Sequence, residues 1–126
     1  MNMASSSDHP ATISIDLKKY RIRVHKAMLH LMGDPKYIQL LVNPDSGIVV
    51  IRSVPRDVPG NLSHKVSSST LQSGNSIELY SRTFTTLLCS VVGVLDTGIL
   101  YRMSGNVLPS QGLAVFDMST LKQIEI

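Results

Sequence analysis

Apolar and polar residues alternate along two short stretches near the start of the chain. Ala11 to Ile15 and Tyr20 to Val24 both repeat with a period of two, which is typical of strands that bury one face. Asp16 to Lys19 lies between them and is polar enough for a connecting turn. The pattern therefore predicts an N-terminal β-hairpin.

The period then changes from two to that of a helix. His25 to Met32 carries apolar residues at helical spacing and predicts a short helix, and Gly33 favours its end. A second hairpin is predicted from Ile38 to Val42 and Ile48 to Ile51, because the residues between these two stretches are strong turn formers. Gly47, the last of these turn residues, is expected to adopt a positive φ.

The second half of the chain shows the same order of elements. Ile77 to Leu79 predicts a strand and Ser81 to Val92 a helix that is longer than the first by about a turn. Ile99 to Met103 is then expected to pair with Leu113 to Phe116 around a turn that ends in Gly112. This order predicts two copies of one β-α-β-β unit, although chance agreement of common elements is the alternative.

Neither unit is long enough to bury a core alone, so the two must share one. The predicted fold class is α+β, with two β-α-β-β units forming a pseudo-twofold, swapped-hairpin-like barrel. We expect residues 1–10 to be a tail and 11–126 a single domain, with unit one at about 11–53, a linker at about 54–75 and unit two at about 76–120. A short strand at His64 to Val66 is expected to correspond to Ile13 to Ile15.

Composition places this domain in a reducing compartment. The chain has 126 residues and one cysteine, Cys89, so it cannot form an internal disulfide. Its first ten residues are polar and rich in serine, unlike a secretory signal, and no apolar run approaches the roughly 20 residues that span a bilayer. We expect a cytoplasmic protein with no membrane association.

Charge is concentrated in the first half. Residues 1–66 hold nine Lys and Arg against five Asp, a net charge of +4, whereas residues 67–126 hold three against four acidic residues, a net charge of −1. The alternation of the second strand puts Ile22 and Val24 inside and Lys19, Arg21 and Arg23 on the outer face. An electrostatic partner should meet this half of the chain.

Sequence signatures of catalysis are missing. The four histidines do not have the spacing of a metal site, Cys89 lies on an apolar stripe, and no nucleophile elbow or phosphate-binding glycine loop is present. We therefore predict a protein that is not an enzyme and uses no metal and no cofactor.

The first unit resembles a known protein family. The resemblance lies in Arg21 to Lys26, Ala27 to Gly33 and Ile48 to Arg52. The family that these segments resemble is the AbrB/SpoVT swapped-hairpin family, and the two units together resemble the tandem, MraZ-like arrangement of that family. The chain departs from the family pattern at Tyr20, where the family has glycine, and at His25, where it has proline. The second unit has Ser76 and Glu78 in place of Arg21 and Arg23.

This resemblance implies a DNA-binding transcriptional regulator. The residues that it nominates for contact with duplex DNA lie on the second strand, its preceding turn and the start of the helix: Lys18, Lys19, Arg21, Arg23 and Lys26. Independently of the family, a row of cations on a rigid face can neutralise several phosphates. The alternatives are a solvated strand face and a non-enzymatic protein-interaction module, antitoxin-like or scaffold, with a protein partner or a homodimer.

Overall fold

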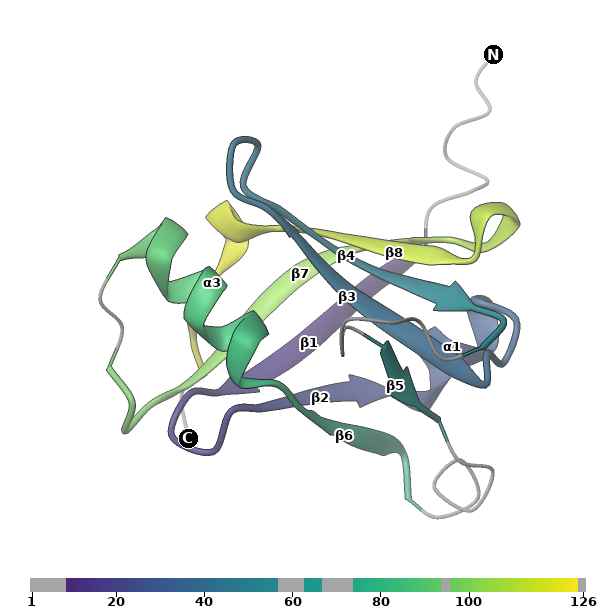
Figure 1. The fold of residues 1–126 in the computed structure, drawn as a ribbon, viewed down its shortest axis with the longest axis horizontal. Coiled ribbons are helices and arrows are strands. Elements are labelled where there is room, and N and C mark those ends of the chain that lie inside the picture. The colour runs from purple at the N-terminus through teal and green to yellow at the C-terminus, as the bar shows by residue number, and fades with distance from the viewer. Residues whose placement is uncertain (1–8, 57–62, 67–73, 94–95, 125–126) are drawn as a thin grey trace.

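The fold is a mostly stranded, nearly closed antiparallel barrel with few helices. The computed structural model describes residues 9–56, 63–66, 74–93 and 96–124. Within them nine strands form one sheet, in the order β5-β3-β4-β8-β7-β1-β2-β6, with β9 paired to β7. In Figure 1 the sheet curls around a common interior, with α1 and α3 at opposite ends.

The elements of the first half agree with their sequence patterns. They are β1 (Pro10–Asp16), β2 (Arg21–His25), α1 (Lys26–Leu31), β3 (Tyr37–Asn43) and β4 (Ile48–Val54). The β1–β2 and β3–β4 pairs are both antiparallel hairpins, as expected. Gly47 has a φ of +70° at the end of the second hairpin, which confirms the predicted left-handed turn residue.

The second half runs through β5 (Ser63–Lys65), β6 (Ser76–Tyr80), α3 (Arg82–Val92), β7 (Leu100–Leu108), β8 (Leu113–Asp117) and β9 (Lys122–Gln123). The hydroxyl of Ser81 caps α3 by accepting a hydrogen bond from the Phe84 N–H. The predicted tail mostly lies outside the described residues, although Pro10 already belongs to β1. The predicted linker contains β5, which pairs with β3.

One predicted strand pairing is wrong. Residues 99–103 do not pair with Leu113 to Phe116, because β8 pairs with the other half of β7, from Gly105 to Leu108. The first half of β7 pairs with β1 instead, with Met103 opposite Ile13. The physical reason is length: β7 has nine residues and reaches a tight turn at Pro109–Gly112, so its C-terminal half is the part adjacent to β8.

The core fills the interior of the barrel with aliphatic side chains. Ile22 and Val24 are fully buried, as expected from the alternation of β2. Each helix contributes two large inward residues, Met28 and Leu29 from α1 and Phe84 and Leu88 from α3. No helix in the described part of the chain is long and apolar enough to cross a membrane.

Four strand pairs of the described residues join the two halves of the chain, and two of them, β2–β6 and β4–β8, determine the surfaces considered below. In the β2–β6 pair, Arg23 lies opposite Glu78. In the β4–β8 pair, Val50 lies opposite Val115. The first pair determines the surroundings of the predicted basic row.

Candidate nucleic-acid interface

The turn between β1 and β2 holds two exposed lysines in place. The Asp16 carboxylate accepts hydrogen bonds from the backbone N–H groups of Lys18 at 3.1 Å and Lys19 at 3.4 Å. Leu17 anchors the turn by burying its side chain, and Tyr20 completes it in the left-handed region with φ +54°. A turn tied down in this way presents both ammonium groups to solvent.

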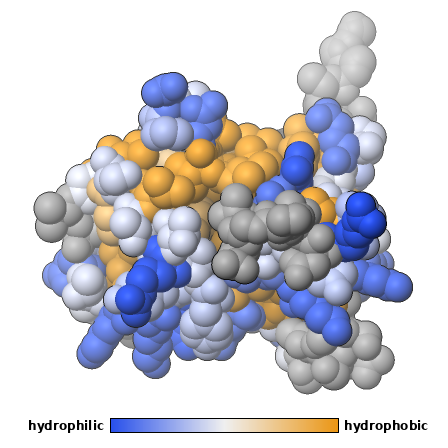
Figure 2. Space-filling view, viewed as in Figure 1, coloured by the Kyte–Doolittle hydropathy of each residue, from blue (hydrophilic) through white to orange (hydrophobic). Residues whose placement is uncertain are grey.

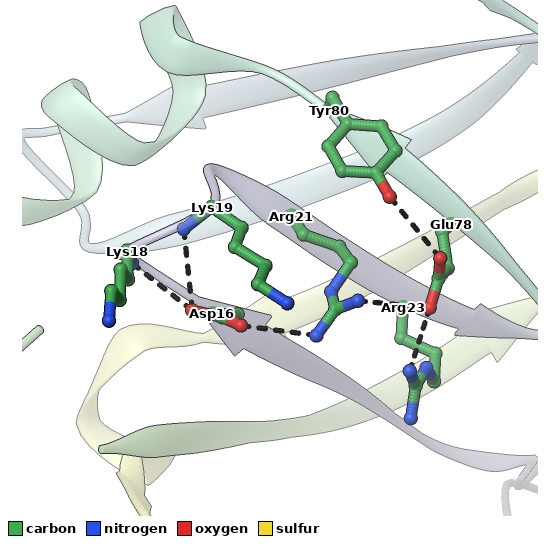
Figure 3. A network of polar contacts seen from close by, with 7 residues as sticks. All are labelled: Asp16, Lys18, Lys19, Arg21, Arg23, Glu78 and Tyr80. Atoms are coloured by element: carbon green, nitrogen blue, oxygen red, sulfur yellow. Dashed lines mark hydrogen bonds and ion pairs between the residues drawn. The ribbon is translucent and has the colours of Figure 1, made fainter. Parts of the chain in front are cut away.

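Arg21 and Arg23 lie on the outer face of β2, as predicted, and both are ion-paired. Arg23 contacts Glu78 at 2.7 Å, and Arg21 contacts Asp16 at 3.1 Å and Glu78 at 3.5 Å. Figure 3 shows Glu78 between the guanidinium groups of Arg21 and Arg23, and Asp16 on the other side of Arg21. Because two negative charges face two positive ones, this part of the row is electrically compensated.

Glu78 is the centre of this network. The hydrogen bond from Arg23, helped by the charges of Arg21 and Arg23, lowers the pKa of Glu78 although partial desolvation opposes the shift. The Tyr80 hydroxyl also donates to Glu78, at 3.3 Å. Glu78 is therefore ionised at neutral pH and competes with any phosphate for the two arginines.

Lys26 lies apart from the turn, at the opposite end of β2. Its Nζ donates to the Gly74 carbonyl at 2.9 Å, and its backbone N–H donates to the Asn75 carbonyl at 2.9 Å. The structure thus groups Lys18, Lys19, Arg21 and Arg23 and separates Lys26 from them.

Three residues near this group were missed by the sequence analysis. Tyr80 and Tyr20 have exposed fractions of 57% and 38%, and the Arg82 guanidinium lies 4.6 Å from the centroid of the Tyr20 ring. Tyr80 lies directly opposite Arg21 in the β2–β6 ladder. The outward position of Tyr80 in the alternation of residues 76–80 was the available signal. Exposed rings among cations are surfaces on which the bases of single-stranded nucleic acids stack.

Histidine and cysteine side chains in the described part of the chain form no second cluster. His30 pairs with Asp34 on the surface, burial lowers the pKa of His64, and Cys89 is partly buried. Among the described residues no three His, Cys, Asp or Glu side chains come close enough to hold a metal ion.

A hollow of about 430 Å³ lies beside the turn, and its lining includes Lys18, Tyr20, Thr85 and Cys89. Among the described residues that line it, Lys18 is the one charged group. The turn therefore presents two cations that have no carboxylate partner among the described residues, whereas the arginines of β2 are paired with carboxylates.

Comparisons with models of known protein families, with curated proteins and with solved structures found no match.

Proposed function

We propose that this chain is a DNA-binding transcriptional regulator that contacts the phosphate backbone through the β1–β2 turn. The observation that carries the proposal is the fixed exposure of Lys18 and Lys19, whose backbone is tied to Asp16. No carboxylate of the described residues lies within ion-pair distance of either ammonium group. Arg82 and the exposed tyrosines extend the same surface.

The proposal includes the internal duplication and the swapped-hairpin-like arrangement. Its support is the symmetry of the strand ladders. With Arg23 opposite Glu78 and Val50 opposite Val115, the β2–β6 and β4–β8 ladders are each centred on a pair of residues that occupy the same place in the two units. The turn glycines Gly47 and Gly112 also share a positive φ, of +70° and +63°.

The two units then differ in charge at the proposed DNA surface. A symmetric protein would place a cation at both central positions of the β2–β6 ladder, whereas this chain has Arg23 on one side and Glu78 on the other. At this surface, the described cations that have no carboxylate partner are Lys18 and Lys19 in the turn of the first unit and Arg82, which lies over the Tyr20 ring. We therefore expect modest affinity for DNA with a shallow salt dependence.

The test is fluorescence polarisation with a labelled duplex of mixed sequence, titrated at several salt concentrations. Replacing Lys18 and Lys19 with Gln should flatten the slope of log K against log salt by about 1.8, since each phosphate contact contributes about 0.9. A matched control replaces Lys36 and Lys122, two exposed lysines on other parts of the chain, with Gln. Absence of binding at low salt, or equal weakening by both double variants, would overturn the proposal.

A second candidate function, the non-enzymatic interaction module, is favoured by a different observation. The middle of the outer face of β3, β4 and β8 is apolar, with Leu41, Val50 and Val115 only partly buried. A protein partner could cover this face, whereas a nucleic acid gains little from it.

A further inference from the structure

The outer face of the barrel is unusually apolar along three neighbouring strands. Strands of an antiparallel sheet with one solvated face normally alternate between apolar inward and polar outward residues. In β4 the inward residues Val49 and Ile51 are fully buried, yet the outward residues between and before them are Val50 and Ile48. The outward positions of β8 include Leu113 and Val115.

The registers align these outward residues across the strands. Leu41 lies opposite Val50 and Val50 lies opposite Val115, so the three side chains form one continuous row, here called the outer apolar row. Figure 2 shows an apolar area over these strands. An apolar area in the middle of a sheet face is typical of a surface that another protein covers.

Two opposite charges flank the outer apolar row. Arg52 and Asp117 have the same outward parity as Val50 and Val115, and they lie at opposite ends of the neighbouring strands β4 and β8. The Arg52 Nε donates to Gln39 at 2.8 Å, which leaves its two terminal nitrogens without a partner among the described residues.

Asp117 is placed to receive such a cation. Its carboxylate accepts the Ser119 N–H at 2.9 Å, and this hydrogen bond lowers the pKa of Asp117 and keeps it ionised. It also lines a hollow of about 670 Å³ that includes Ile48, Leu108 and Val115. The hollow has room for a long side chain from outside.

We propose that a second copy of this chain packs on this face, outer apolar row against outer apolar row. A twofold axis that runs across the strands through the row brings the Arg52 end of one copy over the Asp117 end of the other. With packed sheets about 10 Å apart and strands about 4.8 Å apart, the two Cα atoms are separated by roughly 11 Å, which an arginine and an aspartate can bridge. The face is thus complementary to itself in both apolarity and charge.

The size of the face determines the strength of the dimer. Three strands and three outward rows cover about 14 by 20 Å, or roughly 290 Å² per copy, from the strand spacing and the rise of two residues. The total of roughly 600 Å² is well below the 1,200–2,000 Å² that is usual for stable complexes. We therefore expect a reversible dimer with a dissociation constant in the micromolar range or weaker.

This inference rests on the second candidate function, because it names the partner for that face. The test is sedimentation equilibrium of the full chain over a wide concentration range. Replacing Val50 with Gln should weaken the dimer at least tenfold, whereas Leu31→Gln, which alters an exposed apolar residue on α1, should leave it unchanged.

Charge reversal gives the sharper test. Arg52→Asp and Asp117→Arg each create two like-charge contacts in a symmetric dimer, so each variant alone should dimerise about tenfold less tightly. An equal mixture of the two restores both pairs and should form a heterodimer of wild-type strength. This recovery also shows that both variants are folded.

A mixture that stays monomeric, or a dimer insensitive to Val50→Gln, would overturn the inference. A second outcome is a wild-type chain that stays monomeric and binds an apolar dye, with weaker dye binding by Val50→Gln. That outcome would overturn the second copy as the occupant, although the face would remain a binding surface. A monomeric chain that binds no dye would overturn both the inference and the second candidate function.

Discussion

Replacing Glu78 with Gln should strengthen DNA binding. Glu78 contacts Arg23 at 2.7 Å and Arg21 at 3.5 Å, so it occupies the guanidinium groups that the row on β2 would offer to phosphates. The substitution keeps the shape of the side chain and removes its charge. Asp16 still pairs with Arg21, so the gain is expected mainly at Arg23.

The magnitude follows from one released arginine. One additional phosphate contact adds about 0.9 to the steepness of log K against log salt. Counted from 1 M salt, this raises the affinity for DNA by a factor of about 15 at 50 mM salt and about 4 at 200 mM. The cost to folding should be about 1 kcal/mol or less, because the lost ion pairs are exposed to solvent.

The assay is the polarisation titration at several salt concentrations, with Asp45→Asn as the matched control. Asp45 lies exposed in the β3–β4 turn, so that variant makes the same change in net charge at another loop. Equal effects of the two variants would mean that only the net charge matters. An unchanged slope for Glu78→Gln would refute the claim that Glu78 competes with phosphate.

Three further predictions concern stability. Gly47→Val should cost on the order of 1 kcal/mol or more, because φ is +70° although a Cβ would meet no atom there; an unchanged denaturation midpoint would place the turn elsewhere. Gly105→Ala should cost about 1–3 kcal/mol in the same denaturation assay, more than Gly47→Ala, because its Cβ would lie 1.9 Å from the Val115 carbonyl oxygen. Since the pKa of Glu78 is lowered by folding, its ion pairs stabilise the fold above about pH 4.5, and this contribution is lost as the pH falls through the folded-state pKa. As the pH is lowered below 4.5, thermal denaturation should therefore show a smaller loss of stability for Glu78→Gln than for the wild-type chain. Equal losses of stability in the two proteins would contradict this role of Glu78.

Much of the local structure could be predicted because its causes are local. The alternation of Tyr20 to Val24 determines which side chains β2 buries, and the buried Ile22 and Val24 agree with it. Turn chemistry places the left-handed residue at Gly47, and the apolar spacing of residues 81–92 gives α3. The resemblance nominated Lys18 and Lys19 as candidate cations, and their place in a polar turn between two alternating strands agrees with their exposure.

The tertiary structure alone decided which residues face one another across the barrel. Glu78 lies opposite Arg23 although the two are 55 positions apart, and this pairing turns half of a predicted basic row into a compensated network. The first half of β7 pairs with β1 because β7 is nine residues long and only its second half lies next to β8. The periodicity of the sequence does not show which half of the strand meets which partner. The outer apolar row likewise becomes visible only when β3, β4 and β8 are placed side by side. Periodicity records the inside and outside of each strand, whereas the order of strands around a shared core depends on the packing of the whole chain.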